Sequence, residues 1–353
     1  MLLTLEGHGF RYECENLCRL FFPYSRARVE EGASPEPGEP FAWTGIEAGD
    51  GAYTYRVRVG DGQRQLEKTW TRPALEEYGM TDLLYRAFAE LTGVTPAWGM
   101  LTGIHPVKLL GQYTRELEEK AGLARFRERC HVTAPKADLA RRVLAAQRPT
   151  VESLGENDFS LYVGIPFCPT RCAYCSFVSQ SVEKSMKLIP PFLEALEQEI
   201  AATAAEVKAL GLRPVSVYMG GGTPTTLSAP QLDRLCTVLA EQFDLTALRE
   251  YTVEAGRPDT ITEEKLRVLK QHGVDRVSVN PQTMSDHVLE VIGRKHTAAD
   301  IVEALEKVRK VGGMAVNMDL IAGLPADTPD GFAETLEQVI ALRPENITVH
   351  TLS

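Results

Sequence analysis

The sequence predicts an α/β protein in which a parallel β-sheet, with helices outside it, follows a smaller α+β module. Two observations carry this prediction. From about residue 160, strand-like apolar runs alternate with helical segments, and each crossover is long enough to hold the helix that parallel pairing needs. Before that point, hairpin turn signals are followed by helical patterns. We therefore divide the chain into an N-terminal α+β module of unassigned role, residues 1–150, and an α/β part, residues 151–353.

Six strand-like runs and five helical segments make up the α/β part. The strand-like runs lie at 160–166, 215–219, 249–255, 275–279, 315–321 and 346–352. The helical segments lie at about 187–210, 229–243, 262–272, 285–310 and 329–343. Right-handed crossovers curl such a sheet into a barrel or leave it as an open doubly wound sheet, and the residue pattern alone is compatible with both.

The N-terminal module combines a strand, a helix, a β-meander and further helices. Residues 1–6 have strand character and residues 11–22 have helical character. Asp61-Gly62 is a hairpin turn signal within the meander. Further helical patterns lie at about 74–92, 105–120 and 136–148. The module contains no motif to which we assign catalysis.

Composition excludes several functional classes. The formal net charge of −10 argues against general nucleic-acid binding, because that function needs a basic surface to neutralise phosphates. Seven cysteines, three of them clustered, fit a metal site in a reducing compartment better than a secreted disulfide framework. The sequence shows no signal-peptide layout and no run of 18 apolar residues. We therefore expect a cytoplasmic protein with neither nucleic-acid nor membrane partners.

Three cysteines, Cys168, Cys172 and Cys175, follow a strand-like run with the spacing C-x3-C-x2-C. Thiolates are soft ligands and favour zinc, copper(I) or iron–sulfur clusters. Three thiolates occupy three irons of a four-iron cluster and leave the fourth iron open, whereas a closed structural zinc site needs a fourth ligand. No further cysteine or histidine lies close by in the sequence. A zinc loop and three unrelated core cysteines stay open as alternatives at this point.

A glycine motif, Gly220-Gly221-Gly222-Thr223-Pro224, follows the second strand-like run. Consecutive glycines let the backbone approach a ligand closely. The motif is neither a P-loop nor a dinucleotide-binding fingerprint. A glycine run alone is a weak signal that usually marks a tight turn.

The cysteine and glycine motifs together resemble the signature of the radical S-adenosylmethionine (radical SAM) enzymes. Their flanking residues resemble the oxygen-independent coproporphyrinogen III oxidase (dehydrogenase) family, and residues 280–284 are most similar to its HemZ-type branch. The resemblance covers residues 160–325 and implies a partial (β/α)6 barrel. It also implies a [4Fe–4S] cluster on the three cysteines, with S-adenosylmethionine completing the open iron. By comparison with the family, we expect the chain to end at its sixth strand, without the C-terminal domain.

The resemblance further implies which residues contact S-adenosylmethionine, most of them near the carboxyl ends of predicted strands. Carboxylates can accept hydrogen bonds from its ammonium and hydroxyl groups, and an arginine can form a paired bond to its carboxylate. Taken singly, such an acid is often a helix cap and such an arginine a surface charge. The residues are Tyr162, Tyr174, Gly221, Gly222, Thr223, Glu254, Gln282, Arg294 and Asp319. In the family's oxidases, the positions that match Gln282, Arg294 and Asp319 hold a second S-adenosylmethionine.

The resemblance implies oxidative decarboxylation of the propionate side chains of coproporphyrinogen III to vinyl groups, in heme biosynthesis. The electrons would come from an unidentified low-potential donor. The family's oxidases carry one more cysteine two residues after the third ligand, where this chain has Phe177. In this respect the chain resembles relatives that bind or move heme. A heme chaperone and another radical SAM tetrapyrrole-modifying enzyme are therefore the alternative predictions.

Overall fold

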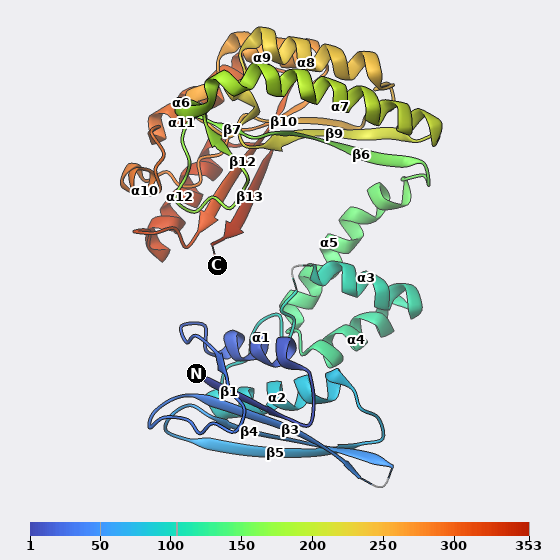
Figure 1. The fold of residues 1–353 in the computed structure, drawn as a ribbon, viewed down its shortest axis with the longest axis vertical. Coiled ribbons are helices and arrows are strands. Elements are labelled where there is room, and N and C mark those ends of the chain that lie inside the picture. Colours follow the sequence, from blue (N-terminus) through green and yellow to red (C-terminus); the bar gives the residue numbers. More distant parts are fainter. Residues whose placement is uncertain (50, 104, 353) are drawn as a thin grey trace. The chain divides into compact units, whose positions relative to one another are not determined.

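The computed structural model describes residues 1–49, 51–103 and 105–352, and the chain forms two compact units, Met1–Leu154 and Gly155–Ser353 (Figure 1). None of the helices among the described residues has the length and apolar character that a membrane crossing requires.

The second unit is built on a six-stranded, fully parallel sheet. Its strands lie in sequence order, from β6 at one edge to β13 at the other. A doubly wound sheet reverses its strand order at a switch point, whereas here every crossover moves one strand in the same direction, as in a barrel. The predicted partial (β/α)6 barrel is confirmed. The strands are β6 (Asp158–Ile165), β9 (Arg213–Gly221), β10 (Glu250–Glu254), β11 (Arg276–Ser278), β12 (Ala315–Ala322) and β13 (Asn346–Thr351).

Helices follow the strands and cover the outer face of this sheet. In Figure 1, α7, α8 and α9 lie together along one side of it. Five of these helices, α8 to α12, begin at a Ser or Thr whose side chain accepts a backbone N–H, which is the usual N-terminal cap. The helices are α6 (Val182–Ser185), α7 (Ile189–Ala209), α8 (Ala229–Gln242), α9 (Glu263–Gln271), α10 (Asp286–Val291), α11 (Ala298–Val311) and α12 (Pro329–Leu342), with 3-10 turns η1 (Met186–Leu188), η2 (Pro224–Thr226) and η3 (Pro258–Thr260).

The single helix predicted over 285–310 is wrong, because the structure divides this segment into α10 and α11. Gly293 has a φ of +77°, a left-handed conformation that a helix interior does not accept. Arg294 and His296 then turn inward and are buried. The break between α10 and α11 therefore places the Arg294 side chain in the interior of the unit.

The two faces of the parallel sheet have different chemistry. Met219, Val253 and Val277 are fully buried in the apolar core. Their neighbours along the same strands, such as Tyr218 and Glu254, line a cavity instead. Because successive side chains of a strand point to opposite faces, the apolar set packs against the helices and the polar set faces the concave side.

The first unit contains a five-stranded mixed sheet of order β2-β1-β3-β4-β5, with α1 and α2 on one face (Figure 1). Helices α3, α4 and α5 form a separate apolar cluster around Leu110 and Phe126. The predicted pattern lacked α4, which begins directly after a break at Leu117–Glu118. The elements are β1 (Leu2–Glu6), α1 (Arg11–Phe21), β2 (Arg28–Val29), β3 (Phe41–Gly49), β4 (Ala52–Gly60), β5 (Gln65–Arg72), α2 (Glu77–Thr92), α3 (Pro106–Glu116), α4 (Glu119–Cys130) and α5 (Ala134–Glu152).

Candidate active site

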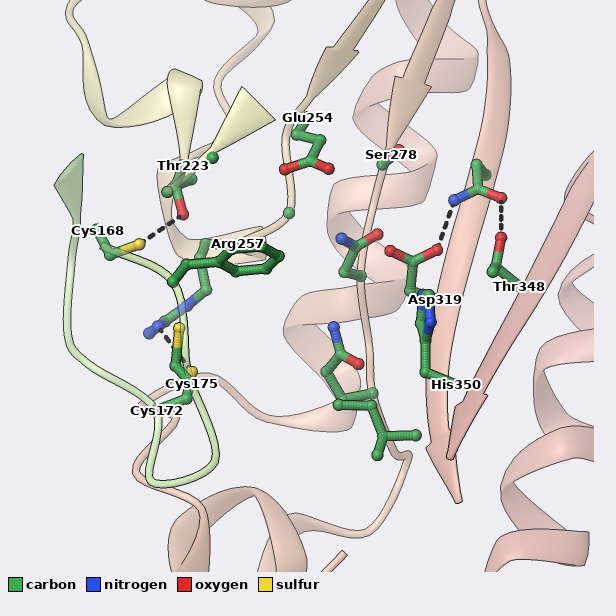
Figure 2. A pocket seen from close by; sticks show the side chains of 18 of the residues that line it. Cys168, Cys172, Cys175, Thr223, Glu254, Arg257, Ser278, Asp319, Thr348 and His350 are labelled. Atoms are coloured by element: carbon green, nitrogen blue, oxygen red, sulfur yellow. Dashed lines mark hydrogen bonds between the residues drawn. The ribbon is translucent and has the colours of Figure 1, made fainter. Parts of the chain in front are cut away.

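A cavity of about 460 Å³ lies on the concave side of the parallel sheet, near the carboxyl ends of its strands (Figure 2). Active sites of parallel barrels lie at this end of the strands. Eleven of the twelve predicted site residues line the cavity, namely Cys168, Cys172, Cys175, Tyr174, Gly221, Gly222, Thr223, Glu254, Gln282, Arg294 and Asp319. The exception is Tyr162.

The three cysteines form one side of the cavity (Figure 2). Their loop is flanked by a two-residue parallel pair, β7 (Phe167–Cys168) with β8 (Gln180–Ser181). The thiols are free, and burial raises the pKa of Cys168. Among the described residues, no group of three or more His, Cys, Asp or Glu side chains is arranged to hold a single metal ion. Three cysteines that line one cavity supply the ligand type by which iron–sulfur clusters are held.

Two hydrogen-bond donors reach these sulfurs from elsewhere in the fold. The Thr223 hydroxyl donates to Cys168 Sγ at 3.5 Å, and Arg257 Nη1 donates to Cys172 Sγ at 3.9 Å. Donors of this kind stabilise a thiolate and alter the affinity and redox potential of a metal bound to it. Arg257 could not be predicted from the sequence, because it belongs to neither the cysteine motif nor the glycine motif.

The glycine motif packs directly against the backbone that leads to the cysteines. The Gly222 N–H donates to Ile165 O at 2.8 Å, and the Thr223 N–H donates to Phe167 O at 2.7 Å. A Cβ on Gly222 would lie 2.6 Å from Phe167 O and 2.7 Å from Ile165 O. Only glycine fits at this position, so the glycine and cysteine motifs form one tightly packed unit.

Two acids occupy the part of the cavity formed by strand ends (Figure 2). At the end of β10, Glu254 Oε1 accepts a hydrogen bond from Tyr218 Oη at 2.5 Å. Burial is the main cause that raises the pKa of Glu254. On β12, Asp319 Oδ1 accepts from Asn317 Nδ2 at 2.7 Å, and Thr348 Oγ1 on β13 donates to Asn317 Oδ1 at 3.0 Å. Neighbouring strands thus hold both carboxylates in place.

Arg294 enters the cavity from the break between α10 and α11. Its guanidinium donates to Asn280 O at 2.6 Å and to Tyr174 Oη at 3.2 Å. The Arg294 Nε, Gln282 Oε1 and Asn280 Oδ1 atoms are buried and have no hydrogen-bond partner among the described residues. Each such atom costs on the order of 1–3 kcal/mol. Three of them around one cavity indicate that a polar ligand supplies the missing partners, as S-adenosylmethionine with its ammonium, carboxylate and hydroxyl groups would.

Tyr162 lies beside the cavity rather than in its lining. Its side chain is 60% exposed, and its ring stacks on that of Tyr218 at 6.0 Å between centroids. Tyr218 was not singled out in the sequence. The alternation of side chains along β9 is the feature of the sequence that could have placed Tyr218 on the inward face. The same alternation brings Thr348 and His350 of β13 into the lining.

Comparisons with known proteins agree with this geometry. Residues 162–339 match the family model described as the radical SAM superfamily. The chain is 39% identical over 266 residues to the oxygen-independent coproporphyrinogen-III oxidase-like protein HemZ of Bacillus subtilis, covering 74% of this chain and 53% of that protein. It is 36% identical over 193 residues to the heme chaperone HemW of Lactococcus lactis, covering 55% of this chain and 48% of that protein.

A solved structure gives a similar result. The coproporphyrinogen III oxidase HemN from Escherichia coli superposes with a TM-score of 0.51 at 33% identity, covering 59% of this chain and 47% of that one. The chain therefore spans about half the length of the relatives that it matches.

Proposed function

The chain belongs to the radical SAM superfamily, and from this premise we propose that it catalyses oxygen-independent oxidative decarboxylation of coproporphyrinogen III. The propionate side chains of this substrate would become vinyl groups. The observation that carries the proposal is a cavity in which three thiols face buried polar atoms that lack a hydrogen-bond partner among the described residues. Its volume of about 460 Å³ lies within the ~300–1,000 Å³ usual for small-molecule sites.

Proteins of this superfamily use a [4Fe–4S] cluster and S-adenosylmethionine, and the cavity fits both. We propose that Cys168, Cys172 and Cys175 hold the cluster and leave one iron open to S-adenosylmethionine. When bound, the two cofactors supply radical chemistry at an unactivated C–H bond. The protein contributes binding, orientation and exclusion of water.

The other predicted residues would hold S-adenosylmethionine across the cavity from the cysteines. Asp319 and Glu254 can accept from its ammonium or hydroxyl groups, and the Tyr218 hydroxyl fixes which Glu254 oxygen stays free. Gln282 Oε1 offers a buried acceptor and Arg294 Nε a buried donor. Because these groups are already positioned by strands β10 and β12 and by the α10–α11 break, little reorganisation is needed on binding.

One observation supports the oxidase over the alternatives. The match to HemZ, a protein named as oxidase-like, spans 266 residues and so extends beyond the domain matched at 162–339. The matches to the heme chaperone HemW and to the oxidase of Escherichia coli have nearly equal length and identity, 36% over 193 residues and 35% over 194 residues, and so favour neither. Against the oxidase reading stands Phe177, which lines the cavity and is 64% exposed where the family's oxidases have a cysteine. This residue keeps a heme chaperone, or another activity on a tetrapyrrole, as the second candidate. For either activity we propose a cytoplasmic setting and, for the oxidase, a separate low-potential electron donor.

The experiment uses full-length protein, reconstituted with iron and sulfide without oxygen and reduced with dithionite. With coproporphyrinogen III, the proposal predicts formation of 5′-deoxyadenosine and of a vinyl-bearing product, both measured by liquid chromatography and mass spectrometry. Stable heme binding and heme delivery to an acceptor, with no substrate-dependent cleavage of S-adenosylmethionine, would refute the oxidase and support the chaperone.

A further inference from the structure

Arg257 is a buried cation that lies against the cysteine loop. It lies in the loop after β10, in the segment Gly256-Arg257-Pro258, and its side chain is 3% exposed. Figure 2 shows its guanidinium beside Cys172, with the dashed line marking the 3.9 Å contact to the sulfur. A charge is rarely buried to this extent unless hydrogen bonds or an opposite charge compensate it.

The same guanidinium fixes the loop between the first two cysteines. Arg257 Nη2 donates to Thr170 Oγ1 at 3.0 Å, and Nη1 donates to Thr170 O at 3.3 Å. Thr170 in turn donates to Gly293 O at 3.0 Å. Since Thr170 lies between Cys168 and Cys172, these bonds hold the part of the loop that joins the two cysteines.

The charged groups near Arg257 do not cancel its positive charge at the Cys172 sulfur. Its ion-pair partner, Asp259, lies 3.3 Å from Nε, and that carboxylate side chain is 33% exposed. Solvent screens an exposed carboxylate more than a buried guanidinium. His296 is fully buried close to Asp259, and burial lowers the pKa of His296 to about 3, so it is neutral at neutral pH and adds no charge.

We propose that Arg257 sets the reduction potential of the cluster through its charge and its hydrogen bond to Cys172 Sγ. The proposal rests on the assignment of the three cysteines as cluster ligands. Reduction adds one electron, supplied by a low-potential one-electron donor, and makes the cluster more negative by one charge. A buried cation and an N–H donor at a ligand sulfur stabilise that reduced form, because the interaction is poorly screened in the interior. Arg257 therefore raises the reduction potential of the cluster, so that the donor can reduce the cluster more readily.

The test measures the midpoint potential by electron paramagnetic resonance during a dithionite titration of reconstituted protein. Arg257→Gln removes the charge and is expected to lower the potential by at least 59 mV, which is a tenfold change in the reduced-to-oxidised ratio for one electron. Asp259→Asn removes the counter-charge, leaves Arg257 in place and is expected to raise the potential. Arg267→Gln, an arginine on the exposed surface of α9, is the matched control and should leave the potential unchanged.

Opposite shifts in Arg257→Gln and Asp259→Asn support an electrostatic role, because loosening of the loop would not change sign with the charge removed. An unchanged potential in Arg257→Gln, or shifts of equal sign in the two variants, would overturn the proposal. If Arg257→Gln fails to retain its cluster, Asp259→Asn decides: a raised potential supports the proposal and an unchanged one overturns it. A wild-type protein that takes up no cluster would instead refute the ligand assignment, and this proposal with it.

Discussion

The two sides of the cavity are held in place by different means. On the strand-end side, Glu254 pairs in register with Ser278, and Asp319 pairs with Thr348, so the parallel ladder fixes each acid. The cysteine side is a loop, and its strand pairing among the described residues is the two-residue pair β7–β8. It depends on contacts with residues far along the chain, such as the Ala173 N–H bond to Ile292 O at 3.0 Å. The strand-end side is therefore preorganised, whereas the cysteine side relies on a few specific neighbours.

The largest expected effect comes from removing a thiol of the loop. Cys172→Ala should lose most of the bound iron and the visible iron–sulfur absorbance, while circular dichroism stays close to that of the wild type, because the loop carries little of the core. Cys236→Ala removes a thiol that is buried in the core on α8. It is the matched control and should keep its iron. Equal iron contents in the two variants would contradict the assignment of Cys172.

The contact between the glycine and cysteine motifs should be the next most sensitive feature. Gly222→Ala places a Cβ against backbone atoms at 2.6–2.8 Å, which cannot move as a flexible side chain could. We expect a loss of about 1–3 kcal/mol in the free energy of unfolding, together with lower iron content. Urea denaturation and iron analysis measure these effects. Gly9→Ala meets no heavy atom within 4 Å and should be neutral; if Gly222→Ala were equally neutral, the packing argument would fail.

On the strand-end side we expect loss of ligand affinity rather than loss of iron. Asp319→Asn removes a charged acceptor whose hydrogen bonds contribute roughly 1.5–3 kcal/mol, so the Kd for S-adenosylmethionine should rise about tenfold or more. Isothermal titration on reconstituted protein measures this. Asp233→Asn changes an acid on α8 that pairs with His272 and should bind as the wild type does. Loss of the cluster in Asp319→Asn would show that the two sides are not separable.

The smallest effect concerns the pH dependence of stability. Burial raises the pKa of Glu254 above its ordinary 4.5, so between that value and the raised pKa the folded state binds more protons than the unfolded state. Glu254 therefore lowers stability progressively as pH rises through this window. Glu254→Gln should gain in free energy of unfolding relative to the wild type as pH rises above 4.5. Urea denaturation at several pH values measures the difference, and a difference independent of pH would contradict the burial argument.

The sequence predicts the strand-end side better than the details of the cysteine side, and the reason is physical. The family resemblance named Glu254 and Asp319, and the alternation of side chains along β10 and β12 agrees with their positions on the inward face. The neighbours of the cysteine loop come from across the chain: Arg257 lies after β10, and Gly293 lies in a break where the pattern predicted a continuous helix. The exposed position of Tyr162 likewise depends on how the edge strand β6 meets β9, which no local pattern encodes.

We propose that the cysteine side and the strand-end side form one site, in which S-adenosylmethionine would contact both the cluster and the strand-end residues. The most direct measurement is the electron paramagnetic resonance spectrum of the reduced, reconstituted protein before and after addition of S-adenosylmethionine. We expect a changed cluster spectrum in the wild type and, at the same ligand concentration, a weaker change in Asp319→Asn. A wild-type spectrum that does not change at saturating S-adenosylmethionine would contradict it.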